Sequence, residues 1–266
     1  MPAWGEPLPT PKQGELRVVT YNVAGLPEGI SNVHPTRTLP LVGPALSRYD
    51  LALVQEDFAY PELLRSGVTL PQRTPGFERK EQLHFGDGLS LFARLPLGDV
   101  RRQKWQACHG VVDAYFDCLT PKGLTMARSE LSPGIGVDVY DVHLDAGDQA
   151  GDVAARRAQL AQLLEAIETW SGEHAVLLGG DFNLGSAEVA DFRKLFRDRG
   201  FLDACDELHC REPSRLDRVL YRGNKRLGLR ARSWKTDGAF KDAQGRPLSD
   251  HLAVAVTLSW RTKGGP

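Results

Sequence analysis

Side chains that can do catalytic chemistry follow apolar segments at several points along this 266-residue sequence. The clearest cases are Ser249-Asp250-His251, Gly179-Gly180-Asp181-Phe182-Asn183 and Tyr140-Asp141-Val142-His143-Leu144. In each case carboxylate, amide or imidazole groups stand where a strand is expected to give way to a loop. Proteins of the α/β class assemble active sites at such positions. The pattern therefore indicates an enzyme.

The strands that would position these groups are visible in the same sequence. Residues 175–178 are continuously apolar, which is typical of a strand buried on both faces, and two glycines follow before Asp181. Residues 136–143 alternate in a way that places Asp141 and His143 on one face of a strand. Three further strands are expected at 16–22, 51–56 and 215–221, and they carry Asn22, Glu56 and Asp217.

The residue types also make chemical sense together. Glu56, Asp181 and Asp250 would repel one another if they converged without a cation, and some of them would take up protons. Oxygen ligands from carboxylates and an amide suit Mg²⁺ or Mn²⁺, with Ca²⁺ as a further option, whereas zinc favours more nitrogen or sulfur. A cation of this kind beside two histidines is suited to the hydrolysis of a phosphate ester. We therefore expect phosphoryl transfer to water.

The order of the motifs resembles the endonuclease/exonuclease/phosphatase superfamily, along nearly the whole chain. The matching motifs are Asn22 after Thr20-Tyr21, Gln55-Glu56, His143-Leu144, Gly180-Asp181-Phe182-Asn183, Arg215-Leu216-Asp217 and Ser249-Asp250-His251-Leu252-Ala253. The resemblance implies an α/β (α+β) fold of the deoxyribonuclease-I type, a four-layered sandwich in which helices flank two central mixed β-sheets. We expect residues 1–14 to form an N-terminal extension and residues 15–262 to form a single catalytic domain.

The resemblance also implies roles for individual residues. Metal binding is expected of Asn22, Glu56, Asp181 and Asp250, and catalysis of His143, His251, Asp217, Asp181 and Asn183. Asp217 would orient His251 through a hydrogen bond. The proton acceptor would be either His251 or Asp181, because accounts of the family differ on this point.

Three further residues are candidate substrate contacts. Lys122 lies between a proline and a glycine, so it is either part of a turn or an ammonium group offered to a phosphate. Arg218 stands where relatives usually have an aromatic residue, and it would either touch an anionic substrate or pair with a neighbouring carboxylate. Asp141 stands where relatives commonly have asparagine or glycine, and it is the third candidate.

The composition fits one compact globular enzyme, and we expect it to be a monomer. Hydrophobic residues make up 41% and charged residues 25%, which argues against a disordered chain. No apolar stretch is long enough to cross a bilayer. Apolar residues recur at helical spacing over 153–170 and 188–199, so we expect two helices that cover a sheet.

The four cysteines favour two disulfides, Cys108–Cys118 and Cys205–Cys210, because neither pair has the spacing of a metal knuckle or a redox motif. Disulfides would indicate a secreted or periplasmic protein, since the cytosol keeps thiols reduced. The sequence opens without a hydrophobic signal core, so a signal peptide would be absent from it. The alternative is a cytoplasmic protein with buried thiols.

The shared site leaves the substrate open, because members of the superfamily cut DNA, RNA, inositol phosphates, sphingomyelin and other phosphoesters. A non-specific nuclease gains affinity from lysine and arginine contacts with backbone phosphates, and this chain has a formal net charge of −1 and no long basic tract. Likeness to the neutral sphingomyelinase-like branch favours a phospholipid headgroup and transient contact with a membrane surface. The alternatives are a deoxyribonuclease-I-like endonuclease that acts on nucleic acid, an inositol phosphate phosphatase, and a non-catalytic binding module.

Overall fold

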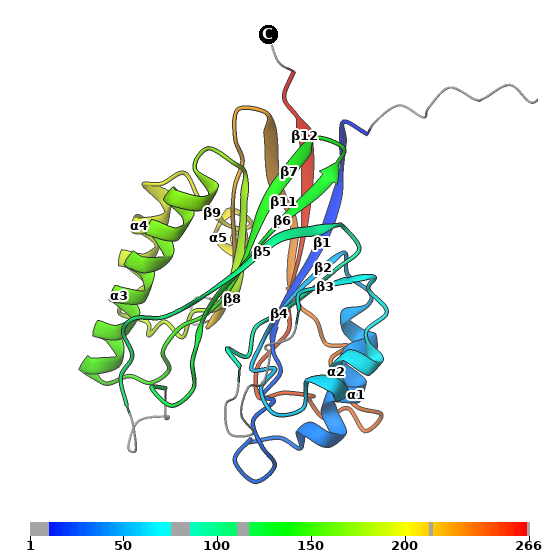
Figure 1. Cartoon of the computed structure of the whole chain (residues 1–266), viewed down its shortest axis with the longest axis vertical. Coiled ribbons are helices and arrows are strands. Elements are labelled where there is room, and N and C mark those ends of the chain that lie inside the picture. Colours follow the sequence, from blue (N-terminus) through cyan, green and yellow to red (C-terminus); the bar gives the residue numbers. More distant parts are fainter. Residues whose placement is uncertain (1–10, 76–85, 111–116, 213–214, 265–266) are drawn as a thin grey trace, which may run out of the picture.

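The computed structural model describes residues 11–75, 86–110, 117–212 and 215–264. Within these ranges the chain forms two mixed sheets of six strands that pack face to face between outer layers of helices (Figure 1). The expected four-layered sandwich is thereby confirmed. The first strand begins at Gln13, and most of the expected N-terminal extension lies outside the described residues.

The first sheet has the strand order β11-β12-β1-β2-β4-β3. Its strands are β1 (Gln13–Asn22), β2 (Leu51–Gln55), β3 (Gln72–Arg73), β4 (Ser90–Ala93), β11 (Leu227–Thr236) and β12 (Val254–Thr262). Strands β1 and β2 run parallel, and Asn22 pairs with Gln55 at their carboxyl ends. Glu56 follows directly, so the register brings the predicted amide and carboxylate to one edge of this sheet.

The second sheet has the order β5-β6-β7-β8-β10-β9. Its strands are β5 (Leu97–Lys104), β6 (Gly123–Ser132), β7 (Ile135–His143), β8 (Val176–Asp181), β9 (Leu202–Asp203) and β10 (Asp217–Arg222). Asp181 pairs with His143 on the parallel strand β7 and with Asp217 on the antiparallel strand β10. Three predicted site residues therefore lie side by side at one edge.

Helices cover the outer face of each sheet. Helices α1 (Pro35–Leu46) and α2 (Pro61–Gly67) lie on the first sheet, and α3 (Ala150–Ala166) and α4 (Val189–Arg197) lie on the second (Figure 1). A short π-helical turn (Ile167–Ser171) extends α3, and α5 (Ala204–Glu207) follows β9. The two helices expected from the sequence are thus confirmed. No helix among the described residues is long and apolar enough to span a bilayer.

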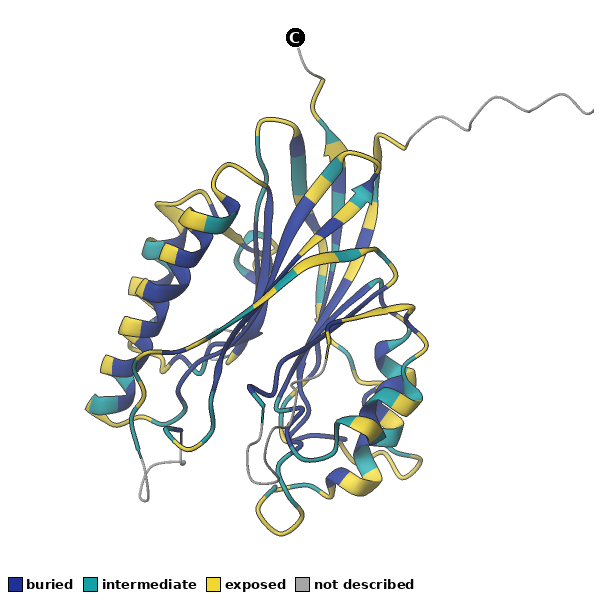
Figure 2. Cartoon of the chain, in the orientation of Figure 1, coloured by how far each residue is buried: buried dark blue, intermediate teal, exposed yellow. Residues whose placement is uncertain are grey.

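Three apolar clusters hold these layers together. One fills the space between the sheets and includes Leu53, Val139 and Val256, all nearly inaccessible to solvent. The other two lie beneath α1 and α2 and beneath α3 and α4. Figure 2 shows the central strands buried on both faces. The polar residues at their ends are consequently held by a rigid, close-packed support.

Candidate active site

The loops at one end of the sandwich enclose a pocket of roughly 480 Å³. Strands β1, β2, β7 and β8 all deliver their carboxyl ends to it (the lower end of Figure 1). Its lining includes seven of the predicted residues: Glu56, Lys122, His143, Asp181, Asn183, Asp250 and His251. Residues that lie up to 195 positions apart in the sequence thus meet in one cavity.

Asn22 links two of the acids at the base of the pocket. Its amide nitrogen donates to Glu56 Oε1 at 2.9 Å and to Asp181 Oδ2 at 3.1 Å, and its Oδ1 accepts from the backbone N–H of Ala24 at 3.0 Å. Burial raises the pKa of Glu56, although the Asn22 hydrogen bond and Lys122 oppose this effect. Two desolvated carboxylates that share one neutral donor form an acidic site able to accept a cation.

The backbone around the acids adopts uncommon conformations. Ala24, Glu56 and Asn183 all have positive φ, at 49°, 60° and 47°, in the region that residues with a side chain seldom enter. Gly25 lies so close to the turn that a Cβ there would stand 2.4 Å from the carbonyl oxygen of Glu56. Clusters of such conformations occur at functional sites, where the surrounding fold enforces them.

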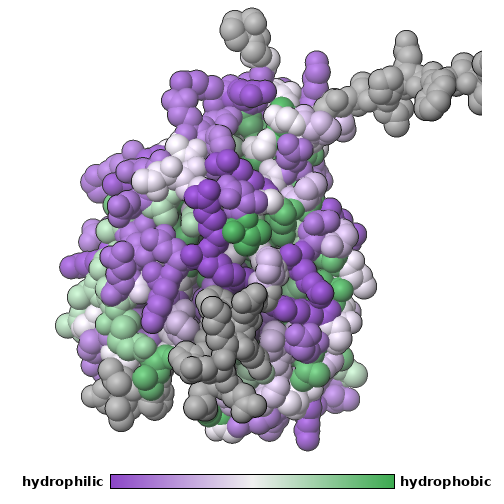
Figure 3. Space-filling model, in the orientation of Figure 1, coloured by the Kyte–Doolittle hydropathy of each residue, from purple (hydrophilic) through white to green (hydrophobic). Residues whose placement is uncertain are grey.

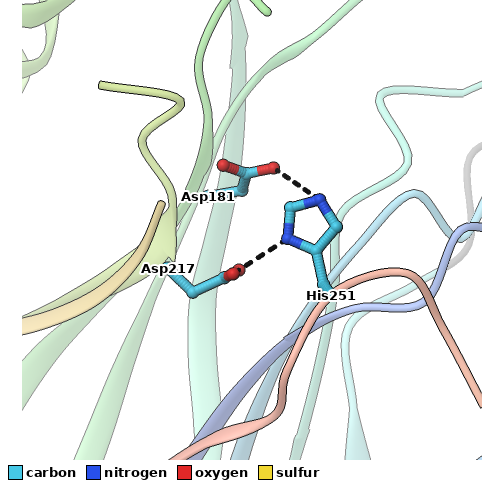
Figure 4. A group of neighbouring side chains, drawn as sticks. All are labelled: Asp181, Asp217 and His251. Carbon is cyan, nitrogen blue, oxygen red and sulfur yellow. Dashed lines mark hydrogen bonds and ion pairs between the residues drawn. The ribbon is translucent and has the colours of Figure 1, made fainter. Parts of the chain in front are cut away.

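His251 joins Asp217 and Asp181 in a short chain of contacts (Figure 4). Its Nδ1 donates to Asp217 Oδ2 at 2.8 Å, and its Nε2 lies 3.7 Å from Asp181 Oδ2. Burial lowers the pKa of His251, but the carboxylates of Asp217, Asp181 and Asp250 outweigh it and raise that pKa to about 10. Burial also raises the pKa of Asp217 to about 6, against the effect of His251. At neutral pH the pair is therefore an imidazolium and a carboxylate.

One donor atom from each of these three residues lies within 4.8 Å of the other two, which is close enough for them to share a metal ion. The geometry favours a different role for the histidine. One of its nitrogens is committed to Asp217, and the other faces Asp181 as a charged donor. Asp217 and His251 therefore form a hydrogen-bonded pair beside Glu56 and Asp181, the two acids that Asn22 links and that are candidates for holding a cation.

His143 occupies the opposite electrostatic state. It is almost fully buried, and its Nε2 lies 3.5 Å from Asp181 Oδ2 and 3.9 Å from Glu56 Oε1. Burial lowers the pKa of His143 well below its usual value, and Lys122 and His251 add to this effect. Asp181 thus lies between a neutral imidazole and a charged one.

The remaining predicted residues form the walls of the pocket. Asn183 donates its side-chain N–H to the carbonyl of Leu144 at 3.0 Å, and its backbone N–H donates to Asp181 Oδ1 at 3.0 Å. Asp250 lies at the mouth, where it accepts from Asn32 Nδ2 at 3.0 Å. No contact joins Asp250 directly to Glu56 among the described residues.

Lys122 is buried against the pocket and pairs with Asp117, a residue that the sequence analysis missed. The Lys122 ammonium also donates to the Leu144 carbonyl at 3.3 Å, and Asp117 accepts from the backbone N–H of Ala146 at 2.8 Å. An acid next to Cys118 and five residues before the lysine was the only signal in the sequence. The pairing fixes the ammonium in the wall, at a position that can face a phosphate.

Two candidate substrate contacts lie outside the pocket. Asp141 shares a face of β7 with His143 but lies two residues deeper, between the sheets, where it accepts from Gln55 Nε2 at 2.6 Å and from the backbone N–H of Val54 at 3.1 Å. Arg218 points to the opposite face of β10 from Asp217, because side chains alternate along a strand. Neither side chain lines the cavity, so the structure places Asp141 away from a substrate and favours, for Arg218, the alternative of a pairing with a neighbouring carboxylate.

Arg218 has a structural environment instead. It is fully buried, donates to Asp203 Oδ2 at 3.2 Å and lies over the ring of Phe192 at 5.2 Å. Arg218→Ala should lower the free energy of unfolding by about 2 kcal/mol, because it removes a buried charged hydrogen bond and the contact with Phe192, while Asp203 keeps its ion pair with Arg215. Chemical denaturation measures this loss. A large fall in turnover without a loss of stability would restore Arg218 as a substrate contact.

The four cysteines lie at disulfide distances. The Cα atoms are 5.3 Å apart in Cys108–Cys118 and 5.0 Å apart in Cys205–Cys210, within the range for a bridge. The first pair borders the pocket, since Cys118 follows Asp117 directly and the backbone N–H of His109 donates to Asp145 Oδ2 at 2.8 Å. The second pair follows β9, away from the pocket lining.

Replacement of each cysteine pair by serine should have different effects on turnover for the two bridges. Each variant should lose about 2–3 kcal/mol of unfolding free energy, because each bridge closes a short loop. Only C108S/C118S should also lose turnover, because Asp117 and Lys122 depend on that loop, and C205S/C210S is its matched control. Equal turnover in both variants would contradict a link between the first bridge and the pocket. Four free thiols in protein purified under oxidising conditions would contradict both bridges.

The fold is a two-sheet α/β sandwich with a pocket at one end that collects most of the predicted site residues. The chain belongs to the Endonuclease/Exonuclease/phosphatase family, whose sequence model matches residues 19–251. It is 31% identical over 266 aligned residues to a sphingomyelinase of Mycobacterium tuberculosis, with coverage of 91% of this chain and 52% of that protein. The chain therefore spans about half the length of the curated relatives it matches.

Solved structures show the same fold. One similar structure is D. rerio TDP2 in complex with a single-strand DNA product, with a TM-score of 0.70, 20% identity, and coverage of 92% of this chain and 98% of that one. Another is a Staphylococcus aureus beta toxin variant with bound magnesium ions, with a TM-score of 0.68, 16% identity, and coverage of 91% and 99%. These likenesses confirm the deoxyribonuclease-I-like architecture predicted from the sequence.

Proposed function

We propose that this protein is a divalent-metal-dependent phosphodiesterase that releases a phosphorylated headgroup from a phospholipid such as sphingomyelin. The observation that carries the proposal is the position of Asp181. The Asn22 amide donates to Asp181 and also to Glu56, so it holds the two acids together. Asp181 also faces the neutral imidazole of His143 and the charged imidazole of His251. Likeness to sphingomyelinases over 91% of the chain supports the lipid class.

Glu56 and Asp181 would hold the cation, with Asn22 beside them and Asp250 nearer the mouth. The donor set fits a hard cation such as Mg²⁺, Mn²⁺ or Ca²⁺, because it consists of carboxylate oxygens, and the Asn22 amide N–H groups hold two of those acids in place. When bound, the cation would neutralise charge on the phosphoryl oxygens and promote attack by water. The magnesium ions in the structurally similar beta toxin support this choice of metal.

The other residues divide the remaining chemistry. His251 is already protonated at neutral pH, so it would donate to a phosphoryl oxygen as negative charge develops, while Asp217 holds its orientation. Because a protonated His251 cannot accept a second proton, Asp181 is the residue that we propose accepts the proton of the attacking water. Neutral His143, Asn183 and Lys122 line the same cavity and would position the phosphate.

The charge of the pocket favours a single phosphodiester over a polyanion. The lining contains five carboxylates, at Glu56, Asp117, Asp148, Asp181 and Asp250, against the imidazolium of His251 and one lysine that is already paired. A nuclease or an inositol phosphate phosphatase needs several cationic groups for the additional phosphates. This balance weakens both alternatives relative to a zwitterionic headgroup.

The substrate class can be tested by comparing sphingomyelin dispersions with plasmid DNA at equal enzyme and Mg²⁺ concentrations. We expect release of the phosphorylated headgroup and no efficient cleavage of the plasmid. Efficient plasmid cleavage without headgroup release would replace the lipid assignment with the nuclease. Binding of either substrate without turnover of any phosphoester would favour the non-catalytic module.

A further inference from the structure

Exposed apolar side chains gather around the mouth of the pocket. Among the described residues, seven large apolar side chains are exposed: Ile30, Leu41, Leu119, Leu202, Leu208, Leu216 and Leu252. Four of them, Ile30, Leu119, Leu216 and Leu252, belong to four separate loops at the pocket end of the sandwich. Their exposed fractions are 66%, 62%, 36% and 61%. We call these four residues the apolar rim.

Contacts of the pocket place the rim residues around it. Ile30 and Leu216 line the cavity itself, and Leu216 and Leu252 together line a depression that shares Asp250 and His251 with it. Leu119 directly precedes Thr120, which also lines the cavity. In Figure 3 apolar side chains appear among polar ones at the lower end of the molecule, where these loops lie.

Single exposed leucines are normal on protein surfaces, but this arrangement is not scattered. The four rim loops connect to elements of both sheets, because they precede α1 and β12 on the side of the first sheet and β6 and β10 in the second. The loops are also held in place. The carbonyl of Leu216 accepts from the backbone N–H of Phe182 at 3.1 Å, and Leu119 follows the Cys108–Cys118 pair. Fixed apolar groups around a polar cavity match a surface that meets an apolar partner.

The charge inside the rim selects the kind of partner. Five carboxylates line the cavity against one paired lysine and the imidazolium of His251, so the lining keeps a net negative charge even when one divalent cation is bound, and this charge disfavours an anionic surface. A zwitterionic phospholipid surface carries no net charge and presents quaternary ammonium groups outermost. Leucine and isoleucine side chains gain free energy when they enter the acyl boundary of such a surface.

We propose that the apolar rim docks the pocket mouth on a zwitterionic phospholipid surface, with Ile30, Leu119, Leu216 and Leu252 inserted between the headgroups. This inference rests on the proposed lipid function and adds the surface by which the protein reaches its substrate. It explains why these four side chains remain exposed around the mouth of a site whose charged groups lie inside it.

The test is flotation with phosphatidylcholine vesicles in the presence of chelator, so that binding is measured without hydrolysis. Leu119→Ser/Leu252→Ser should lower the partition coefficient by about 30-fold or more, because two exposed leucines no longer transfer from water. Leu202→Ser/Leu208→Ser, which changes two exposed leucines near α5, should leave it within about twofold. Circular dichroism of both variants verifies folding, and Ile30→Ser provides an independent rim substitution.

Wild-type protein should bind phosphatidylcholine vesicles better than phosphatidylglycerol vesicles, with little dependence on salt. Equal binding by the two double variants, or binding to anionic vesicles alone, would overturn the proposal. Self-association that the rim variant abolishes would reassign the rim to a second copy of the chain. Vesicle binding that depends on the rim, without headgroup release, would refute the proposed function but support the docking surface. Headgroup release together with binding that does not depend on the rim would refute the docking surface alone.

Discussion

Replacement of His251 by alanine is expected to lower the turnover of a phosphodiester by about 100-fold or more, the contribution typical of a positioned acid or base. The physical reason is that His251 supplies the charged donor nearest Asp181, at 3.7 Å, and no other imidazolium lines the pocket among the described residues. Steady-state hydrolysis of a soluble aryl phosphodiester at saturating Mg²⁺ measures the effect.

His174→Ala is the matched control, because His174 also pairs with a buried acid, Asp138, at 3.1 Å, but lies away from the pocket. Its turnover should stay near that of the wild type. Wild-type turnover in a folded His251→Ala variant would refute the assignment of His251 to catalysis.

The pH dependence separates the two members of the pair. Asp217 raises the pKa of His251, so Asp217→Asn should lower that pKa towards its ordinary value near 6.5. The imidazolium would then be lost as pH rises through neutrality, and the variant should lose more turnover at pH 8 than at pH 6. A merely structural role for Asp217 would lower turnover equally at both values.

The second large effect is expected at Glu56. Glu56→Gln removes one of the two carboxylates assigned to the cation, so half-maximal activity should require at least about tenfold more Mg²⁺. Titration of activity against Mg²⁺ measures the shift. Glu165→Gln, on the exposed face of α3, is the control and should leave the titration unchanged. Unchanged Mg²⁺ dependence in Glu56→Gln would remove Glu56 from the cation site.

Stability gives an independent readout for the same variant. Burial raises the pKa of Glu56, so the metal-free folded state becomes less stable as pH rises from the unfolded pKa towards the folded pKa. Glutamine carries no charge and avoids this loss. The metal-free Glu56→Gln variant should therefore be at least as stable as the wild type at pH 8, and a loss of stability would indicate a structural role for the carboxylate.

The sequence predicted the fold and most of the pocket because both depend on strand ends. The apolar run 175–178 ends at two glycines before Asp181, and the parallel registers then set His143 beside Asp181 and Asn22 beside Gln55. The positions of these residues at neighbouring strand ends follow from local apolar patterns and from the order of the motifs, so they could be predicted without a structure.

Features that depend on packing between distant elements could not be predicted in this way. Helix α1 contains Pro40 and Pro44, which disrupt the usual helical pattern, and it was not foreseen. The Asp117–Lys122 pair joins residues on either side of Cys118, and the local sequence pattern does not show that the two side chains meet. The burial of Arg218 follows from its face on β10, where α4 supplies an aromatic partner, and a single strand pattern does not reveal which face meets which neighbour.

The most direct test of the central claim is hydrolysis of bis(para-nitrophenyl) phosphate by the wild-type protein in Mg²⁺ and in excess chelator. We propose that the pocket hydrolyses phosphodiesters only when Glu56 and Asp181 hold a divalent cation. We therefore expect turnover in Mg²⁺, loss to background in chelator, and recovery when Mg²⁺ or Mn²⁺ is restored. Full turnover in excess chelator, or none with any divalent cation, would contradict this account.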